Sequence, residues 1–295
     1  MTKPARPGRQ APGVYHRTVG DFSVSALNDG MFEAAFAWLT NITPDEAARL
    51  HDTTFRAVPP RITISSFLVQ TDERLTLIDT GCGTSMGPAL GGLARNLRLL
   101  GIEPPDVDTV LATHLHPDHI GGMVDRDGKA VFPNAELVVH AADAQFWGDD
   151  ATLAGAGNDQ DRGFVELARA TLAAYRDRTR LLTKGDGVRG ISIVPEPGHT
   201  PGHSGWLISS GKESLLIWGD IVHMPGVQFS RPGAGMGFDI DGAAAIATRQ
   251  RIMDMAAADR LAVAGMHLDF PCFGHVTRAQ EGYAFVPEVW TPFGA

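Results

Sequence analysis

Thr113-His114-Leu115-His116-Pro117-Asp118-His119 is the stretch of sequence that decides the fold of this chain. It follows the apolar residues 107–112 and precedes Ile120-Gly121-Gly122, which is the setting of a buried strand that ends in a polar turn. Residues two apart in a strand face the same way, so His114 and His116 can converge on one point.

The second part of the stretch indicates more than one ion. Pro117 suits the first turn of a helix, where its missing N–H is not needed. Asp118 and His119 leave that turn in different directions, so they cannot both join the first histidine pair around one small ion. A lone histidine here would more often be a core or surface residue, but four ligand-type residues in six positions have no obvious packing purpose. We therefore expect two divalent metal ions side by side, and imidazole and carboxylate ligands suit zinc.

The spacing of apolar residues predicts the elements around this stretch. Strands are expected over residues 22–27, 62–69, 75–78, 107–112, 136–139, 191–194, 206–209, 214–218 and 261–264. Helices are expected over residues 44–50, 86–100, 141–147, 163–175 and 243–257. Asn28-Asp29-Gly30 is a hairpin-turn signal, and residues 148–162 are expected to form a mobile surface loop.

Five ligand-type residues follow the carboxyl ends of expected strands, namely Asp79, His114, His199, Asp220 and His267. Ligands of layered α/β proteins bind at that edge. We therefore expect loops from distant parts of the chain to meet at one rim of an α/β fold. Residues 14–295 are expected to form a single domain of two similar halves.

The ligand candidates divide into two groups that share one residue. One ion would take His114, His116 and His199, and the other would take Asp118, His119 and His267. Asp220 is the expected bridge, because a carboxylate can bind one ion with each oxygen. Two cations roughly 3.5–4 Å apart can share a hydroxide, because a metal lowers the pKa of its bound water toward about 7. Hydrolysis then needs no serine or cysteine nucleophile.

Four further polar residues are expected to support the site. Asp79 is expected to fix a ligand histidine by accepting its free N–H. His203 is expected to hydrogen-bond the backbone or a ligand, and for His275 a supporting and a purely structural role are equally open. His223, three residues past Asp220, is expected beside the metals, where it can donate to a substrate oxygen; plain packing is the alternative.

Six apolar residues that flank the site in sequence are expected to wall a substrate pocket, namely Phe146, Trp147, Met224, Phe229, Met236 and Phe238. Taken singly, each is more often a core residue. Such a pocket would admit a small organic molecule as the substrate.

The composition and charge of the chain argue against several classes of protein, among them nucleic-acid-binding and membrane proteins. The net charge of −9 argues against nucleic acid and anionic membranes as partners. No apolar run approaches the length of a membrane span, and Cys82 and Cys272 are expected to be free thiols. Residues 1–13 carry three basic residues without a following hydrophobic region, so we expect a flexible tail, not a signal peptide, and a cytoplasmic protein.

The motif set resembles the metallo-β-lactamase-fold hydrolases. It comprises Asp79-Thr80-Gly81, His114-x-His116-x-Asp118-His119, His199, Asp220 and His267, and the likeness spans about residues 20–275. The resemblance implies a four-layer αββα sandwich with a dinuclear zinc site at one edge. The phrases Phe132-Pro133-Asn134-Ala135, Pro197-Gly198-His199-Thr200-Pro201-Gly202-His203 and Val227-Gln228-Phe229 are similar to the branch of quorum-quenching N-acyl homoserine lactonases and methyl parathion hydrolases. Resemblance to this branch also suggests a homodimer.

Departures from the family pattern refine the expected activity. Homoserine lactonases carry a tyrosine three residues after the bridging aspartate, and the parathion hydrolase carries an apolar residue there, whereas this chain has His223. A class B β-lactamase is disfavoured because such sites lack the aspartate bridge, and an RNA-processing role is disfavoured by the acidic charge. We expect a dizinc hydrolase of lactones or aryl esters, with Asp118, Asp220 and His223 as catalytic residues. Phosphotriester hydrolysis is the alternative, and a metal-stabilised binding protein without catalysis is a second one.

Overall fold

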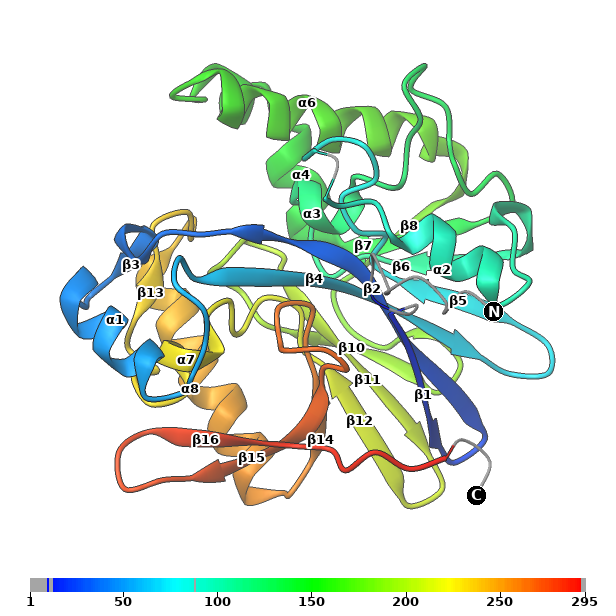
Figure 1. Ribbon diagram of the computed structural model, residues 1–295. Helices are drawn as coiled ribbons and strands as arrows, with labels where there is room; N and C mark the ends of the chain where they lie inside the picture. The colour runs from blue at the N-terminus through cyan, green and yellow to red at the C-terminus, as the bar shows by residue number, and fades with distance from the viewer. Residues whose placement is uncertain (1–9, 11–12, 88, 293–295) are drawn as a thin grey trace, which may run out of the picture.

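Two seven-stranded sheets form the centre of the molecule (Figure 1). The computed structural model describes residue 10 and residues 13–87 and 89–292. All strands of the first sheet precede all strands of the second, so each half of the chain builds one sheet. Helices cover the outer faces, which confirms the expected αββα arrangement. Of the expected flexible tail, only residues 10 and 13 are described, and the rest of that prediction lies outside the described residues.

Nine of the sixteen strands in the described residues lie where alternation and apolar runs predict them, and the sequence does not predict the strands at residues 14–19, 39–40, 179–182, 186–188, 235–236, 273–278 and 283–287. The first sheet contains, in spatial order, β1 (Val14–Val19), β2 (Phe22–Glu33), β4 (Arg61–Gln70), β5 (Leu75–Ile78), β6 (Thr109–Leu111), β7 (Glu136–His140) and β8 (Thr179–Leu182). The second contains β16 (Tyr283–Pro287), β15 (Phe273–Arg278), β14 (Ala262–Ala264), β12 (Glu213–Ile217), β11 (Ser204–Ser210), β10 (Ile191–Pro195) and β9 (Asp186–Val188). A short pair, β3 (Leu39–Thr40) with β13 (Gly235–Met236), joins the two halves.

The helices differ from the prediction in three places, of which the first is the short helix at Pro225–Gln228, which the sequence does not predict. The helices are α1 (Pro44–Asp52), α2 (Leu93–Leu99), α3 (Pro117–Ile120), α4 (Ala141–Gly148), α5 (Asp150–Ala154), α6 (Asp159–Ala174), α7 (Pro225–Gln228) and α8 (Gly242–Ala258). The expected helix over residues 86–100 is wrong before Leu93, because Gly87 and Gly91 take the positive φ angles of 107° and 81°. Residues 148–162 are not a plain loop but contain α5 and the start of α6, capped by the side chains of Asp149 and Asn158.

The hairpin turn predicted at Asn28-Asp29-Gly30 is wrong. These residues form a bulge inside the long strand β2, which pairs with β4 on both sides of it. The buried Asp29 carboxylate accepts backbone N–H groups from Cys82 at 2.9 Å, Gly91 at 3.1 Å and Leu93 at 2.9 Å. The polar residue therefore fixes the loop that follows Asp79 and does not make a turn.

The main core lies between the two sheets. Its fully buried members include Phe67 of β4 and Trp206 of β11, so side chains from both halves interdigitate. A second cluster lies between the first sheet and the helices α2, α4 and α6. Each large apolar side chain buried in this way stabilises the fold by roughly 1.5–3 kcal/mol. Among the described residues, no helix has both the length and the apolar character to cross a membrane.

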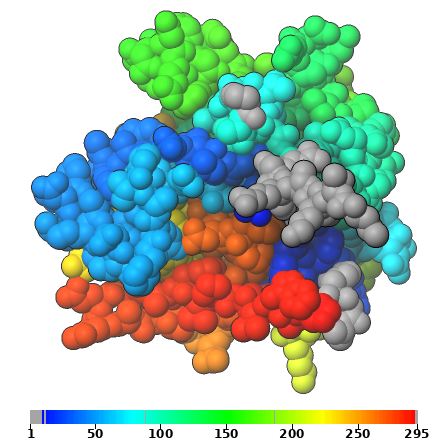
Figure 2. Space-filling model, in the orientation of Figure 1, coloured from blue at the N-terminus to red at the C-terminus, as the bar shows by residue number. Residues whose placement is uncertain are grey.

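The two ends of the described chain lie on one face of the molecule (Figure 2). Arg17 of β1 forms an ion pair with Glu288 at 2.6 Å, and the Tyr15 hydroxyl donates to the same carboxylate at 3.2 Å. The segment after β16 is therefore tied to the first strand, which links the two halves of the chain.

Candidate metal centre

Loops at the carboxyl ends of four strands position the candidate ligands. β5 and β6 run parallel, as do β12 and β14, so the loops that follow each pair leave their sheet at one edge. The stretch after β6 turns sharply at His116, whose extended backbone (φ −74°, ψ 154°) precedes Pro117 at the first position of α3. This turn places His116 and His119 on opposite sides of the same short segment.

Three histidines and one carboxylate form the first group. His114 Nε2 lies 2.9 Å from His116 Nδ1, and His116 Nδ1 lies 2.9 Å from His199 Nε2. Asp220 Oδ2 lies 3.2 Å from His199 Nε2 and 3.7 Å from His114 Nε2. These four side chains are the group predicted from the sequence for one ion, and all four are buried.

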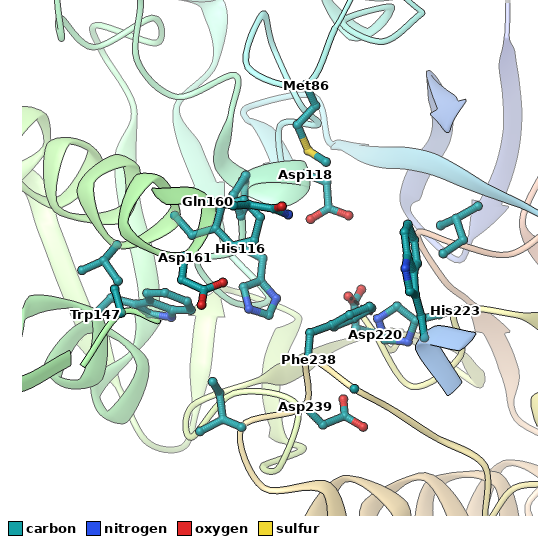
Figure 3. A pocket seen from close by; sticks show the side chains of 18 of the residues that line it. Met86, His116, Asp118, Trp147, Gln160, Asp161, Asp220, His223, Phe238 and Asp239 are labelled. Carbon is teal, nitrogen blue, oxygen red and sulfur yellow. Dashed lines mark ion pairs between the residues drawn. The ribbon is translucent and has the colours of Figure 1, made fainter. Parts of the chain in front are cut away.

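The second group surrounds the other oxygen of the same aspartate. Asp220 Oδ1 lies 3.2 Å from His119 Nε2 and 3.1 Å from His267 Nε2. Asp118 Oδ2 lies 3.6 Å from each of these nitrogens. Asp220 thus faces one group with each carboxylate oxygen, as its expected bridging role requires. Figure 3 shows His116, Asp118 and Asp220 directed toward the space between the two halves.

The spacing of these atoms fits metal coordination. Tetrahedral zinc with nitrogen ligands at about 2.0–2.1 Å has ligand-to-ligand separations of about 3.3 Å. The observed separations of 2.9 to 3.7 Å span that value. His119 Nε2 and Asp220 Oδ1 are buried and have no hydrogen-bond partner among the described residues, which is costly unless a cation satisfies them. Burial opposes a charged ring, yet Asp220, Asp118 and Asp79 raise the pKa of His119 well above its ordinary value, so the cluster favours positive charge.

Hydrogen bonds behind three of the histidines direct their Nε2 lone pairs toward the centre, whereas His116 presents Nδ1. His119 Nδ1 donates to Asp79 at 2.7 Å, and His267 Nδ1 donates to the Thr63 carbonyl at 2.8 Å. The Thr113 hydroxyl donates to Asp79 at 2.7 Å and therefore accepts from His114 Nδ1 at 3.0 Å. Because each Nδ1 carries the proton, each Nε2 is left as an acceptor that can bind a metal. Asp79 lies where the sequence predicts it.

Asp239 is a supporting residue that the sequence did not reveal. Its Oδ1 accepts from His199 Nδ1 at 2.8 Å and its Oδ2 accepts from the Met236 backbone N–H at 2.9 Å. Asp239 belongs to no motif and follows no strand of either large sheet. Its neighbour Phe238, an expected pocket residue, was the nearest available signal.

Asp239→Asn is expected to weaken metal binding by about 10- to 100-fold. An amide has one acceptor oxygen, so one of the two N–H groups from His199 and Met236 would face an amide NH₂. Dialysis against graded chelator, followed by metal analysis, measures the change. Asp72→Asn in an exposed turn is the matched control, and equal metal retention in the two variants would contradict the prediction.

The two other histidines proposed as supports have different outcomes. His203 is fully buried, and its Nε2 accepts the Asp220 backbone N–H at 2.8 Å, so its Nδ1 carries the proton and donates to the Glu196 carbonyl at 2.8 Å. Burial lowers the pKa of His203 to about 3. It therefore fixes the backbone of the bridging residue. His275 lies on β15 with an exposed side chain and does not approach the site, because its strand pairs at the far side of β14.

His223 lies beside the candidate ligands. Its ring stacks on His267, with centroids 5.0 Å apart, and Nε2 lies 3.0 Å from Asp220 Oδ2. Neither ring nitrogen has a partner with hydrogen-bond geometry among the described residues. Burial lowers the pKa of His223 to about 4, so the neutral ring carries one N–H that can be donated.

A pocket of about 800 Å³ opens onto the centre (Figure 3). Of the six expected wall residues, Phe146, Trp147 and Phe238 line it. Met224, Phe229 and Met236 do not, and their assignment is corrected: they are buried in apolar core clusters because their segments fold inward against α1, Trp218 and β3. Sequence reasoning missed the wall residues Phe32, Trp38, Ile62 and Phe164. No lysine or arginine is among the described residues that line the pocket.

Comparisons with known proteins agree with this geometry. The family model described as the metallo-beta-lactamase superfamily matches residues 60–267. A solved structure of the hydrolase AbOPH, in the beta lactamase superfamily, is 32% identical, covers 96% of this chain and 100% of that chain, and has a TM-score of 0.90. The structure of AidC, a dizinc quorum-quenching lactonase in complex with the product N-hexanoyl-L-homoserine, is 26% identical, covers 95% and 99%, and has a TM-score of 0.89.

Curated relatives match over shorter regions. A probable metallo-hydrolase of Mycobacterium tuberculosis is 30% identical over 195 residues, which are 54% of this chain and 56% of that protein. The N-acyl homoserine lactonase AttM of Azorhizobium caulinodans is 32% identical over 131 residues, which are 43% of this chain and 45% of that protein. The chain thus spans about half the length of these curated relatives.

Proposed function

Because the chain belongs to the metallo-beta-lactamase superfamily, we propose that this metal-dependent hydrolase opens lactones or aryl esters at a pair of zinc ions. The observation that carries the proposal is the shared carboxylate of Asp220, which faces three histidines with one oxygen and His119, His267 and Asp118 across the other. AidC, which is described as a dizinc lactonase, has the same fold as this chain.

The residues around the pair supply distinct functions. When bound, the cations lower the pKa of a water molecule toward neutrality and polarise the carbonyl under attack. Asp118 is the most accessible of the candidate ligands, with 16% of its side chain exposed, and its oxygen that does not face the ligand nitrogens can accept the proton of the attacking water. The N–H of His223 donates to the ester oxygen of the lactone as its bond to the carbonyl carbon breaks. The aromatic walls hold the rest of the substrate and exclude water.

A neutral phosphotriester is the second candidate substrate. The absence of cationic side chains among the described wall residues, together with aromatic walls from several segments, suits an uncharged molecule with aryl groups. The same pair of cations would polarise its phosphoryl oxygen.

A substrate panel tests the ranking of these activities. The zinc-loaded protein is assayed with dihydrocoumarin, N-hexanoyl homoserine lactone and methyl paraoxon, and kcat/KM is compared. We expect a lactone to be the best substrate. A higher value for methyl paraoxon would reverse the ranking, and no turnover of any of the three by fully loaded protein would favour a metal-stabilised binding protein.

His223→Phe is expected to lower kcat for lactone opening by about 100-fold, because the N–H that stabilises the departing oxygen is lost. Metal content should not change, since phenylalanine preserves the stacking on His267. Steady-state kinetics and elemental analysis measure both. His275→Phe on the exposed face of β15 is the control. Unchanged turnover would remove the catalytic role of His223, and loss of metal would make it a ligand instead.

A further inference from the structure

The helix α7 follows His223 closely in sequence, and no side chain caps its N-terminus. The residue before the helix is Met224, whose side chain cannot accept a hydrogen bond from the first N–H groups. Gln228, the last residue of α7, instead reaches back to the two residues that precede the helix. Its Oε1 accepts the backbone N–H of His223 at 2.7 Å and that of Met224 at 3.0 Å.

Gln228 shares a second contact, the Ala234 carbonyl, with the buried residue Arg249. Gln228 Nε2 donates to the Ala234 carbonyl at 3.0 Å, and the Arg249 guanidinium donates to that carbonyl at 2.9 Å. Arg249 also donates to the carbonyl of Ile221 at 2.7 Å. Gln228 is fully buried and Arg249 is 1% exposed, so water does not compete for these bonds. The backbone on both sides of His223 is therefore fixed from below by α7 and α8.

The ring of His223 depends on this support. Its Nε2 lies 3.0 Å from Asp220 Oδ2, but neither nitrogen has a partner with hydrogen-bond geometry among the described residues. The ring therefore rests on contacts with the rings of His199, His267 and Phe238, at centroid distances of 4.9, 5.0 and 5.3 Å. His199 and Asp79 differ in this respect, because hydrogen bonds fix their side chains directly. The direction of the His223 N–H thus follows from the position of its backbone.

We infer that Gln228 is a positioning residue, which holds the His223 backbone so that the ring N–H meets the departing oxygen of the substrate. The inference rests on the proposed function, because that function gives His223 its part in the reaction. Methionine at position 228 would fill the same volume without accepting either N–H. Glutamate has the same shape and keeps the oxygen that accepts both N–H groups, and with a proton on its second oxygen it also donates to the Ala234 carbonyl.

A double-mutant cycle tests the inference on the zinc-loaded protein with N-hexanoyl homoserine lactone. Gln228→Met is expected to lower kcat about tenfold with little change in KM, since small displacements of a reacting group are costly. In the His223→Phe background the same change is expected to lower kcat less than twofold. Gln228→Glu should keep kcat within about threefold of the original, and Gln250→Met on the exposed face of α8 should have no effect.

Two further readouts separate this inference from the proposed function. Hydrogen exchange of the peptide containing His223 and Met224 should quicken in Gln228→Met and stay slow in Gln250→Met, with equal metal content in both. An equal loss of kcat in both His223 backgrounds, or unchanged exchange, would overturn the positioning role. If the original protein opens no lactone, the proposed function fails; slow exchange at His223 that quickens in Gln228→Met would then still support the backbone contact.

Discussion

Asp220→Asn is expected to lower kcat/KM for lactone opening by about 10³-fold, equivalent to roughly 4 kcal/mol of transition-state stabilisation. The carboxylate oxygens of Asp220 lie 3.1 to 3.7 Å from nitrogens of both ligand groups, so one substitution affects both ions. An amide presents one neutral oxygen and an NH₂ group that repels a cation. We therefore expect the variant to retain at most one ion per chain.

Kinetics and elemental analysis on the same sample check this result. Asp259→Asn, at the exposed end of α8, removes one carboxylate far from the pocket and should keep full activity and two ions. The His203 ring would still accept the backbone N–H at position 220, so the fold around the variant should persist and circular dichroism should be unchanged. An Asp220→Asn protein with two ions and normal turnover would contradict the bridging role.

Removal of all metal is expected to abolish hydrolysis, with less than about 1% of the activity left. Stability should fall as well, because each ion that binds only the folded state stabilises it by about 2.7 kcal/mol at a free concentration 100 times Kd. For 295 residues, with an unfolding entropy of about 2.1 cal/mol/K per residue, this corresponds to a decrease in Tm of roughly 4 °C for each ion removed. Chelation, assay and calorimetry measure the two effects, and the return of activity should need two equivalents of zinc per chain.

The stoichiometry decides the outcome of this experiment. Full recovery with one equivalent would contradict a pair of ions, and activity that persists after complete chelation would contradict a metal-dependent reaction. The Asp220→Asn protein serves as the control for stability, because its Tm should respond less to chelation than that of the original protein.

The ligand groups could be predicted from the sequence because several ligands lie only a few residues apart, where local backbone geometry fixes their directions. His114 and His116 are two residues apart on extended backbone, and Pro117 forces the turn that separates them from His119. Asp220 and His267 could be predicted because each lies three residues after the end of an apolar strand. In these cases local backbone geometry and strand direction are sufficient.

Contacts that depend on how segments fold together could not be predicted in this way. Asp239 accepts a hydrogen bond from His199, which lies 40 residues away in the chain, and no local sequence pattern predicts this contact. Asp29 is predicted to lie in a turn, yet its carboxylate accepts hydrogen bonds from backbone N–H groups of a loop more than 50 residues away in the chain. Met224 and Phe229 flank the site in sequence and still face the core. The homodimer, the cytoplasmic location and the single-domain boundary at residue 14 stay predictions.

The wide separation of the ligand-bearing loops also bears on how the protein matures. The candidate ligands run from His114 to His267 and come from both sheets, so the second group is incomplete until the ribosome has released residue 267. A nascent chain that carries only the first sheet therefore offers incomplete ligand groups, with no shared carboxylate. Contacts of such long sequence separation form slowly, so under the proposed function the second ion would be bound only after both sheets have assembled.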